Sequence, residues 1–204
     1  MELENVCSDL KDLHVDKSVD ALQKGESSQQ TDNNWFLPQE DFFMSVCNLT
    51  AARSKDPVTK VGACIIDKDN KIVSVGYNGM PLGISDCDLP WTKNNQTMYM
   101  NKYPYVCHAE MNAIMNGKRN DFKNCTIFVN KFPCSDCAKM IIQAGVKHVV
   151  YSQKKPEPPE VFIPASKMFS LAKVTFREFV PTVREIEITM GGHDAGITCI
   201  NIDK

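Results

Sequence analysis

Apolar and polar positions alternate along the first half of the chain in a way that predicts one helix followed by two strands. A helix is expected to begin after Pro38, because acidic residues occupy its first turn and apolar side chains recur at helical spacing. These apolar side chains are Phe42, Phe43, Val46, Leu49 and Ala52. Two β-rich runs follow at 61–66 and 71–75, and the polar turn 67–70 between them is typical of a hairpin.

The second half alternates between strand-like and helix-like segments. The expected elements are a helix over 107–116, a strand over 126–129, a helix over 134–144, a strand over 148–151, a helix over 166–172 and a strand over 174–180. Such a succession implies parallel strands joined by crossover helices, hence an α/β sandwich built on a mixed sheet. A last alternating run, 185–189, is expected at an edge. The loop over 80–105 is long enough to suggest a site or a subunit contact.

The two ends of the chain lack these patterns. Residues 1–34 are rich in polar residues and are interpreted as a flexible N-terminal arm, with only a weak apolar stripe over 6–22. Residues 35–190 are expected to form one domain, because 204 residues of which 43% are hydrophobic supply one ordinary core. Residues 191–204 are interpreted as a C-terminal tail.

Charge and cysteine content narrow the class of protein. A formal net charge of −2 gives no basic stripe for a nucleic acid, so a small-molecule partner is favoured. The sequence shows no apolar run long enough to span a bilayer and no signal-like start, so we expect an intracellular, cytoplasmic protein with no membrane partner. In that compartment the nine cysteines stay reduced, and they are either buried or bound to a metal.

Two short motifs carry the candidate chemistry: His108-Ala-Glu110 and Pro133-Cys-Ser-Asp-Cys137. Two cysteines three residues apart at a helix start project toward one point, and the helix N-terminus favours thiolates. One imidazole and two thiolates give Zn²⁺ three protein ligands and leave a fourth position open, as catalytic zinc sites require. Together the two motifs are the signature of zinc nucleobase deaminases. We therefore expect His108, Cys134 and Cys137 to bind the metal.

Glu110 is the candidate catalytic residue. It follows His108 by two residues, and its carboxylate is expected to carry protons from water to the ring nitrogen and to the departing amine. The alternative is a closed structural zinc knuckle in which Cys107 or His148 supplies a fourth ligand. Cys107 is otherwise expected to be a buried hydrophobe, and His148 a solvent-facing or capping residue. Plain core packing is expected for Cys47, Cys64 and Cys125.

Beyond these motifs the chain resembles the deoxycytidylate (dCMP) deaminase family over about residues 35–151. The resemblance is carried by Arg53-Ser-Lys-Asp-Pro57, Val61-Gly-Ala-Cys-Ile-Ile66, Gly76-Tyr-Asn-Gly-Met-Pro81, Leu89-Pro-Trp91, Lys102-Tyr-Pro-Tyr-Val-Cys-His-Ala-Glu110 and Ile141-Ile-Gln-Ala-Gly145. It implies a three-layer α/β/α fold with a five-stranded sheet, zinc catalysis and conversion of the deoxynucleotide dCMP to dUMP for thymidylate synthesis. It also implies a homo-hexamer that dCTP activates and dTTP inhibits.

The resemblance further implies roles for individual residues. Asn78 and Ala109 are candidates for holding the sugar and base of the substrate. Arg53, Ser54 and Lys55 are candidates for its 5′-phosphate, because a dianion favours cationic and neutral donors together. Effector-nucleotide binding is expected at Asn78, Gly79, Met80 and Pro81. Solvated helix ends and simple turns are the structural alternatives for these segments.

The sequence departs from the family after Tyr151. The proline-rich run 153–160 replaces a segment that is usually polar and acidic, and Pro164 is expected to delay the next helix. A related deaminase acting on dCTP or on a 5-substituted dCMP would also fit the upstream residues. Two further alternatives are a catalytically silent regulatory paralogue, which the intact Glu110 disfavours, and a polynucleotide-editing enzyme, which the charge balance disfavours.

Overall fold

A mixed five-stranded sheet forms the centre of the computed structural model, which describes residues 36–93, 97–118, 122–153, 159–192 and 196–201. Its strands are β1 (Gly62–Ile66), β2 (Ile72–Tyr77), β3 (Thr126–Val129), β4 (His148–Tyr151) and β5 (Thr175–Glu178), in the spatial order β2-β1-β3-β4-β5. Strand β1 is antiparallel to both neighbours, whereas β3, β4 and β5 are parallel. The predicted hairpin and mixed sheet are confirmed. The expected arm over 1–34 lies outside the described residues.

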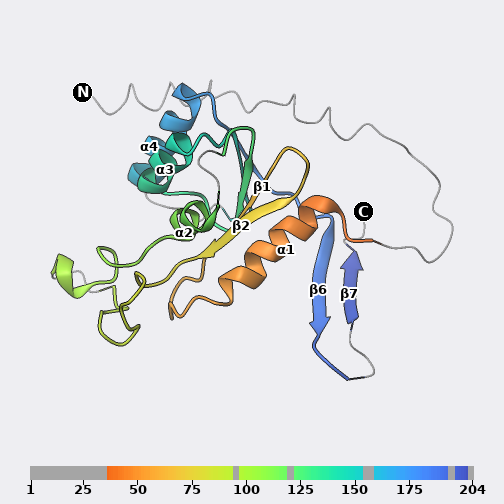
Figure 1. Cartoon of the computed structure of the whole chain (residues 1–204), viewed down its shortest axis with the longest axis horizontal. Coiled ribbons are helices and arrows are strands. Elements are labelled where there is room, and N and C mark those ends of the chain that lie inside the picture. Colours follow the sequence, from red (N-terminus) through yellow and green to blue (C-terminus); the bar gives the residue numbers. More distant parts are fainter. Residues whose placement is uncertain (1–35, 94–96, 119–121, 154–158, 193–195, 202–204) are drawn as a thin grey trace.

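Helices cover both faces of this sheet (Figure 1). Helix α1 (Gln39–Ala51) packs on one face, and α2 (Ala109–Asn116), α3 (Ser135–Gln143) and α4 (Pro159–Leu171) gather on the other. Successive side chains of a strand point to opposite faces. Accordingly Cys64 of β1 packs in the core beneath α1, and Ile65 in the core beneath the other three helices. The predicted three-layer α/β/α architecture is confirmed.

Helix α1 uses a different face from the predicted one. Its buried apolar residues are Phe43, Met44, Cys47 and Ala51, whereas Phe42 and Leu49 are exposed. Apolar residues occur around much of this helix, so its periodicity alone does not select a face. The buried face is set by the sheet, because Gly62 has no side chain and the backbone of α1 packs closely against it. A Cβ at position 62 would lie only 2.0 Å from the Cys47 carbonyl oxygen.

The strand predicted over 185–189 does not lie at an edge of the central sheet, so that expectation was wrong. It belongs to β6 (Val183–Thr189), which pairs antiparallel with β7 (Gly196–Asn201) in a separate two-stranded sheet that projects below α1 (Figure 1). The buried Asp41 carboxylate of α1 accepts hydrogen bonds from the backbone N–H groups of Thr182 and Val183, which turns the chain away from β5. Strand β7 lies within the segment interpreted as a tail.

Helix α4 also differs from the prediction, because it begins at Pro159 and runs through Pro164 instead of starting near residue 166. A proline inside a helix removes one backbone donor and clashes with the preceding turn. Pro164 is the sixth of the 13 residues of α4, and burial of Ala165 and Phe169 against the core holds the following turns in place. Among the described residues no helix is both long and apolar enough to cross a membrane.

Candidate metal centre

The topology brings two loop ends to the same edge of the sheet. Strands β2 and β3 both run antiparallel to β1 between them, so their carboxyl ends lie together. Just after β2, Gly79 forms an isolated antiparallel bridge with Cys107, with N–O distances of 3.1 and 2.9 Å. Because of this bridge, His108 lies close to the end of β2. Cys134 follows closely after the end of β3.

Both segments then turn into helices at the site. His108 is the N-cap residue of α2 and Cys134 is the N-cap residue of α3, each with extended backbone angles and without a side-chain capping bond. The two helices therefore begin two residues and one residue later than predicted, respectively. Since the first N–H groups of a helix lack intrahelical partners, both helix N-termini favour negative charge at this point.

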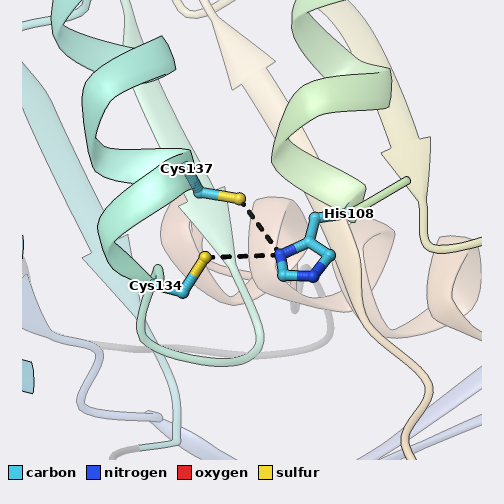
Figure 2. Close-up of side chains that lie close together, drawn as sticks. All are labelled: His108, Cys134 and Cys137. Carbon is cyan, nitrogen blue, oxygen red and sulfur yellow. Dashed lines mark hydrogen bonds between the residues drawn. The ribbon is translucent and has the colours of Figure 1, made fainter. Parts of the chain in front are cut away.

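His108, Cys134 and Cys137 converge (Figure 2). Nδ1 of His108 lies 3.4 Å from Sγ of Cys134 and 3.3 Å from Sγ of Cys137, and the three ligand atoms lie within 4.8 Å of one another. Bonds of ~2.3 Å to sulfur and ~2.0–2.1 Å to nitrogen at a tetrahedral angle would separate sulfur and nitrogen by ~3.6 Å. The donor set and its spacing thus fit Zn²⁺.

Close contacts among the three groups shift the pKa of each of them. The hydrogen bond between His108 and Cys134 raises the pKa of His108 to about 9, although burial lowers it. Hydrogen bonds from Cys137 and from His108 lower the pKa of Cys134 to about 4, although burial opposes them. The hydrogen bond between Cys137 and Cys134, together with burial, raises the pKa of Cys137. A cation bound here would replace the protons of these groups, as is usual when thiolate and imidazole ligands take up a metal.

Glu110 lies in the first turn of α2 and is only 4% exposed. Burial raises the pKa of its carboxyl group, and its neighbours include His108 and the thiol of Cys137. A raised pKa makes a carboxyl group a better proton acceptor, and a buried carboxyl group can serve as general base and then as general acid. The structure therefore places a buried carboxyl group beside the three candidate ligands, at the position where the sequence motif predicts the proton carrier.

The closed-knuckle alternative finds no support in the described part of the chain. His108, Cys134 and Cys137 form the group of candidate ligands there, and neither Cys107 nor His148 belongs to it. His148 begins β4, is exposed, and its Nδ1 lies 2.7 Å from Oγ1 of Thr175. The expected core positions of three further cysteines are confirmed, since all of them are fully buried: Cys47, Cys64 and Cys125.

The candidate substrate residues Asn78 and Ala109 are both buried near the centre. Asn78 donates through Nδ2 to Asp56 Oδ2 at 3.2 Å and to the Thr59 carbonyl at 3.0 Å, and its Oδ1 accepts the Val61 N–H at 2.8 Å. An amide offers two donor hydrogens and two acceptor lone pairs. Both donors are engaged within the protein, so a direct contact with substrate is left to the second lone pair of Oδ1.

The three candidate phosphate residues diverge in their surroundings. Arg53 is exposed, whereas Ser54 is buried and its hydroxyl oxygen accepts the N–H of Asp56 at 3.2 Å. Lys55 is exposed and forms an ion pair with Asp86 at 2.5 Å. In this arrangement Arg53 and Lys55 are the members of the trio that solvent reaches.

The candidate effector segment borders the metal centre through the backbone. Gly79 is bonded to Cys107, the residue before His108, and the next two residues, Met80 and Pro81, are partly buried. A ligand bound to this segment would be connected to His108 through the backbone hydrogen bonds between Gly79 and Cys107.

Sequence reasoning missed a buried ion pair between Asp56 and Lys102, which are 1% and 6% exposed in their side chains. The two residues are 46 positions apart, so no local spacing pairs them. One signal was available in Asp56-Pro-Val-Thr59, because an aspartate before a proline is typical of a turn capped by its side chain. Oδ1 of Asp56 accepts the N–H groups of Val58 at 2.8 Å and Thr59 at 3.0 Å.

Comparison with known families agrees with this geometry. The family model described as the cytidine and deoxycytidylate deaminase zinc-binding region matches residues 37–153, more than half of the chain. The chain belongs to this deaminase family. The match includes both metal motifs and Glu110.

Several members of the family are similar over most of their length. The human deoxycytidylate deaminase is 49% identical over 153 residues, which are 75% of this chain and 86% of the human protein. The mouse enzyme is 50% identical over the same shares, and a probable deoxycytidylate deaminase of Caenorhabditis elegans is 41% identical over 76% of this chain and 77% of its own. Among solved structures, the dCMP deaminase of cyanophage S-TIM5 in complex with dCMP and dUMP is 26% identical with a TM-score of 0.55, covering 69% of this chain and 96% of that one.

Proposed function

We propose that this deaminase converts dCMP and water to dUMP and ammonia, with His108, Cys134 and Cys137 holding Zn²⁺ and Glu110 moving protons. The observation that carries the proposal is the convergence of one imidazole, two thiols and one buried carboxyl group at the starts of two adjacent helices. Family membership and the similarity to deoxycytidylate deaminases support the choice of substrate.

The residues of the chain divide the chemistry between them. When bound, Zn²⁺ supplies Lewis acidity that lowers the pKa of a coordinated water toward ~7. Glu110 takes one proton from the attacking water and delivers it to N3 of the pyrimidine. It then takes the second proton from the hydroxyl now on C4 and delivers it to N4, so that ammonia leaves as the C4–N4 bond breaks and the C4 carbonyl forms. Oxygen from water thereby replaces nitrogen at C4. The N-termini of α2 and α3 favour negative charge beside Cys134 and Cys137, which would bind the metal as thiolates.

Substrate contacts and regulation complete the proposal. Asn78, which precedes the bridged Gly79, and Ala109, which follows His108, would contact sugar and base, while Arg53, Ser54 and Lys55 would supply the 5′-phosphate site. Effector nucleotides, dCTP as activator and dTTP as inhibitor, would bind at the segment 78–81 of a homo-hexamer. The Gly79–Cys107 bridge supports this coupling, because it links that segment directly to the chain entering His108.

The test is a turnover assay of purified, zinc-loaded protein. The substrates are dCMP, dCTP, deoxycytidine and CMP, each with and without added dCTP or dTTP, and single-stranded DNA and RNA serve as negative substrates. Preferential conversion of dCMP with opposite responses to the two effectors is expected. Preference for dCTP or for a 5-substituted dCMP would keep the chemistry and change the substrate, and silence on every substrate would favour a regulatory paralogue.

A further inference from the structure

The carboxylate of Asp56 is the centre of a buried hydrogen-bond network next to the metal centre. Oδ1 accepts the backbone N–H groups of Val58 and Thr59, and Oδ2 accepts Nδ2 of Asn78 and Nζ of Lys102. Its side chain is 1% exposed and that of Lys102 is 6% exposed. Buried charges that are paired and hydrogen-bonded on both oxygens are costly to disturb, because removing one partner leaves the other uncompensated.

One arm of this network runs from Asp56 through Asn78 to His108. Oδ2 of Asp56 accepts Nδ2 of the Asn78 side chain. The Asn78 backbone N–H donates to the Val61 carbonyl, and Oδ1 of Asn78 accepts the Val61 N–H. The following residue, Gly79, exchanges two backbone hydrogen bonds with Cys107. The position of Asn78 therefore sets the position of the residue immediately before His108.

The second arm runs through Lys102. The Lys102 carbonyl accepts the N–H groups of Tyr105 at 3.1 Å and Val106 at 3.0 Å, which closes a tight turn. That turn leads directly to Cys107 and His108. Since the Lys102 ammonium is fixed on Asp56, the turn is fixed as well.

We infer that Asp56 is a positioning residue for the deamination site: balanced by the charge of Lys102, it fixes from two sides the chain that presents His108. The inference rests on the proposed function, because it gives Asp56 a task in the same centre. Groups that orient metal ligands from outside the ligand set commonly change metal affinity or activity ~10- to 100-fold when they are replaced. Asp56 lies 52 positions before His108 in the sequence and acts through hydrogen bonds and the backbone alone.

The test compares the D56N variant with the wild-type chain. The new amide keeps an acceptor for Val58 and Thr59 but turns an NH₂ donor toward Asn78 and Lys102, which are donors themselves. At a temperature at which circular dichroism shows full folding, zinc transfer to a chelator is expected to be ~10- to 100-fold faster. The kcat for dCMP is expected to fall by a similar factor. KM for dCMP should rise as well, because Asp56 also holds the proposed substrate contact Asn78.

The matched control is D69N, which neutralises the exposed Lys68–Asp69 pair on the β1–β2 turn. It removes the same charge from an aspartate–lysine pair, but from an exposed one, and should leave zinc release and kcat unchanged. Wild-type zinc release and kcat in folded D56N would overturn the inference. So would losses no larger than those of D69N.

Two charge-preserving variants carry the test if D56N does not fold. D56E and K102R retain both charges and shift only the hydrogen-bond geometry, so a smaller loss in the same direction is expected in folded protein. Failure of both to fold, or wild-type values in both, would overturn the inference. If the wild-type chain binds zinc but does not convert dCMP, the proposed function fails, whereas the zinc-release comparison still decides whether Asp56 positions the site.

Discussion

Gly76 of strand β2 lies directly against the backbone of helix α2, and one added methyl group there should displace the part of the metal centre that α2 carries. A Cβ at position 76 would lie 2.2 Å from the Ala113 nitrogen and 2.4 Å from the Ala109 carbonyl oxygen. These distances are about 1 Å short of the 3.4 Å at which ordinary contact begins. Because the obstructing atoms are helix backbone, α2 itself must move, and Glu110 moves with it.

The two expected effects of Gly76→Ala differ in size. Overpacking of this kind costs about 1–3 kcal/mol of unfolding free energy. For a chain of this length that loss corresponds to a decrease of about 2–12 °C in Tm. A displacement of about 1 Å among catalytic groups can reduce turnover by about 100-fold. Activity per folded molecule should therefore fall far more than stability explains.

Gly62→Ala provides the matched control. Its Cβ would lie 2.0 Å from the Cys47 carbonyl oxygen and 2.7 Å from the Ala51 nitrogen, both in the backbone of α1. Helix α1 carries none of the candidate site residues. Tm and dCMP turnover are measured on both zinc-loaded variants below their unfolding transitions. Both should lose stability and only Gly76→Ala should lose kcat; equal kcat values in the two variants would refute the reasoning.

Four further perturbations test the site and the fold. Glu110→Gln should keep its zinc, measured by metal analysis, while dCMP turnover falls about 10²- to 10⁴-fold, and surviving turnover in the loaded variant would remove the proton-carrier role. Cys137→Ser should lose zinc and turnover together, because a hydroxyl replaces a soft thiolate ligand. Phe169→Ala should cost about 3–5 kcal/mol in chemical unfolding, whereas the exposed Phe36→Ala should cost little. Burial alone would raise the pKa of Asp56, but Lys102 and the N–H groups of Thr59 and Val58 hold it below its usual value. Its stabilisation is thus present above pH ~4 and is lost as the pH falls through the lowered pKa, so the stability difference between wild type and D56N should shrink in acid.

The elements around the metal centre could be predicted because their determinants are local. The strands over 126–129 and 148–151 have the predicted limits residue for residue, since short apolar β-branched runs bounded by polar residues leave little choice. The three candidate ligands were likewise visible, because two of them lie within one helical turn and the third begins the neighbouring helix. Their convergence needed only the order of the strands in addition.

Features decided by distant parts of the chain could not be predicted from local patterns. Helix α1 has apolar residues on more than one side, and only the missing side chain of Gly62 shows which side packs. The pairing of Asp56 with Lys102 depends on the path of a long loop. The course of the chain after Thr182 depends on the buried Asp41 carboxylate of another element. In each case the deciding contact joins residues that no spacing rule relates.

The segments after Tyr151 bear on the site to different degrees. The Gln153 carbonyl accepts the N–H of Phe132 at 3.1 Å, two residues before Cys134, so the departure from the family begins beside the loop that carries a metal-ligand candidate. The β6–β7 hairpin is fastened instead to Asp41, whose helix lies on the opposite face of the sheet from α2 and α3. Differences in nucleotide preference within the family are therefore expected to follow changes at Gln153, because its carbonyl contacts the loop that carries Cys134.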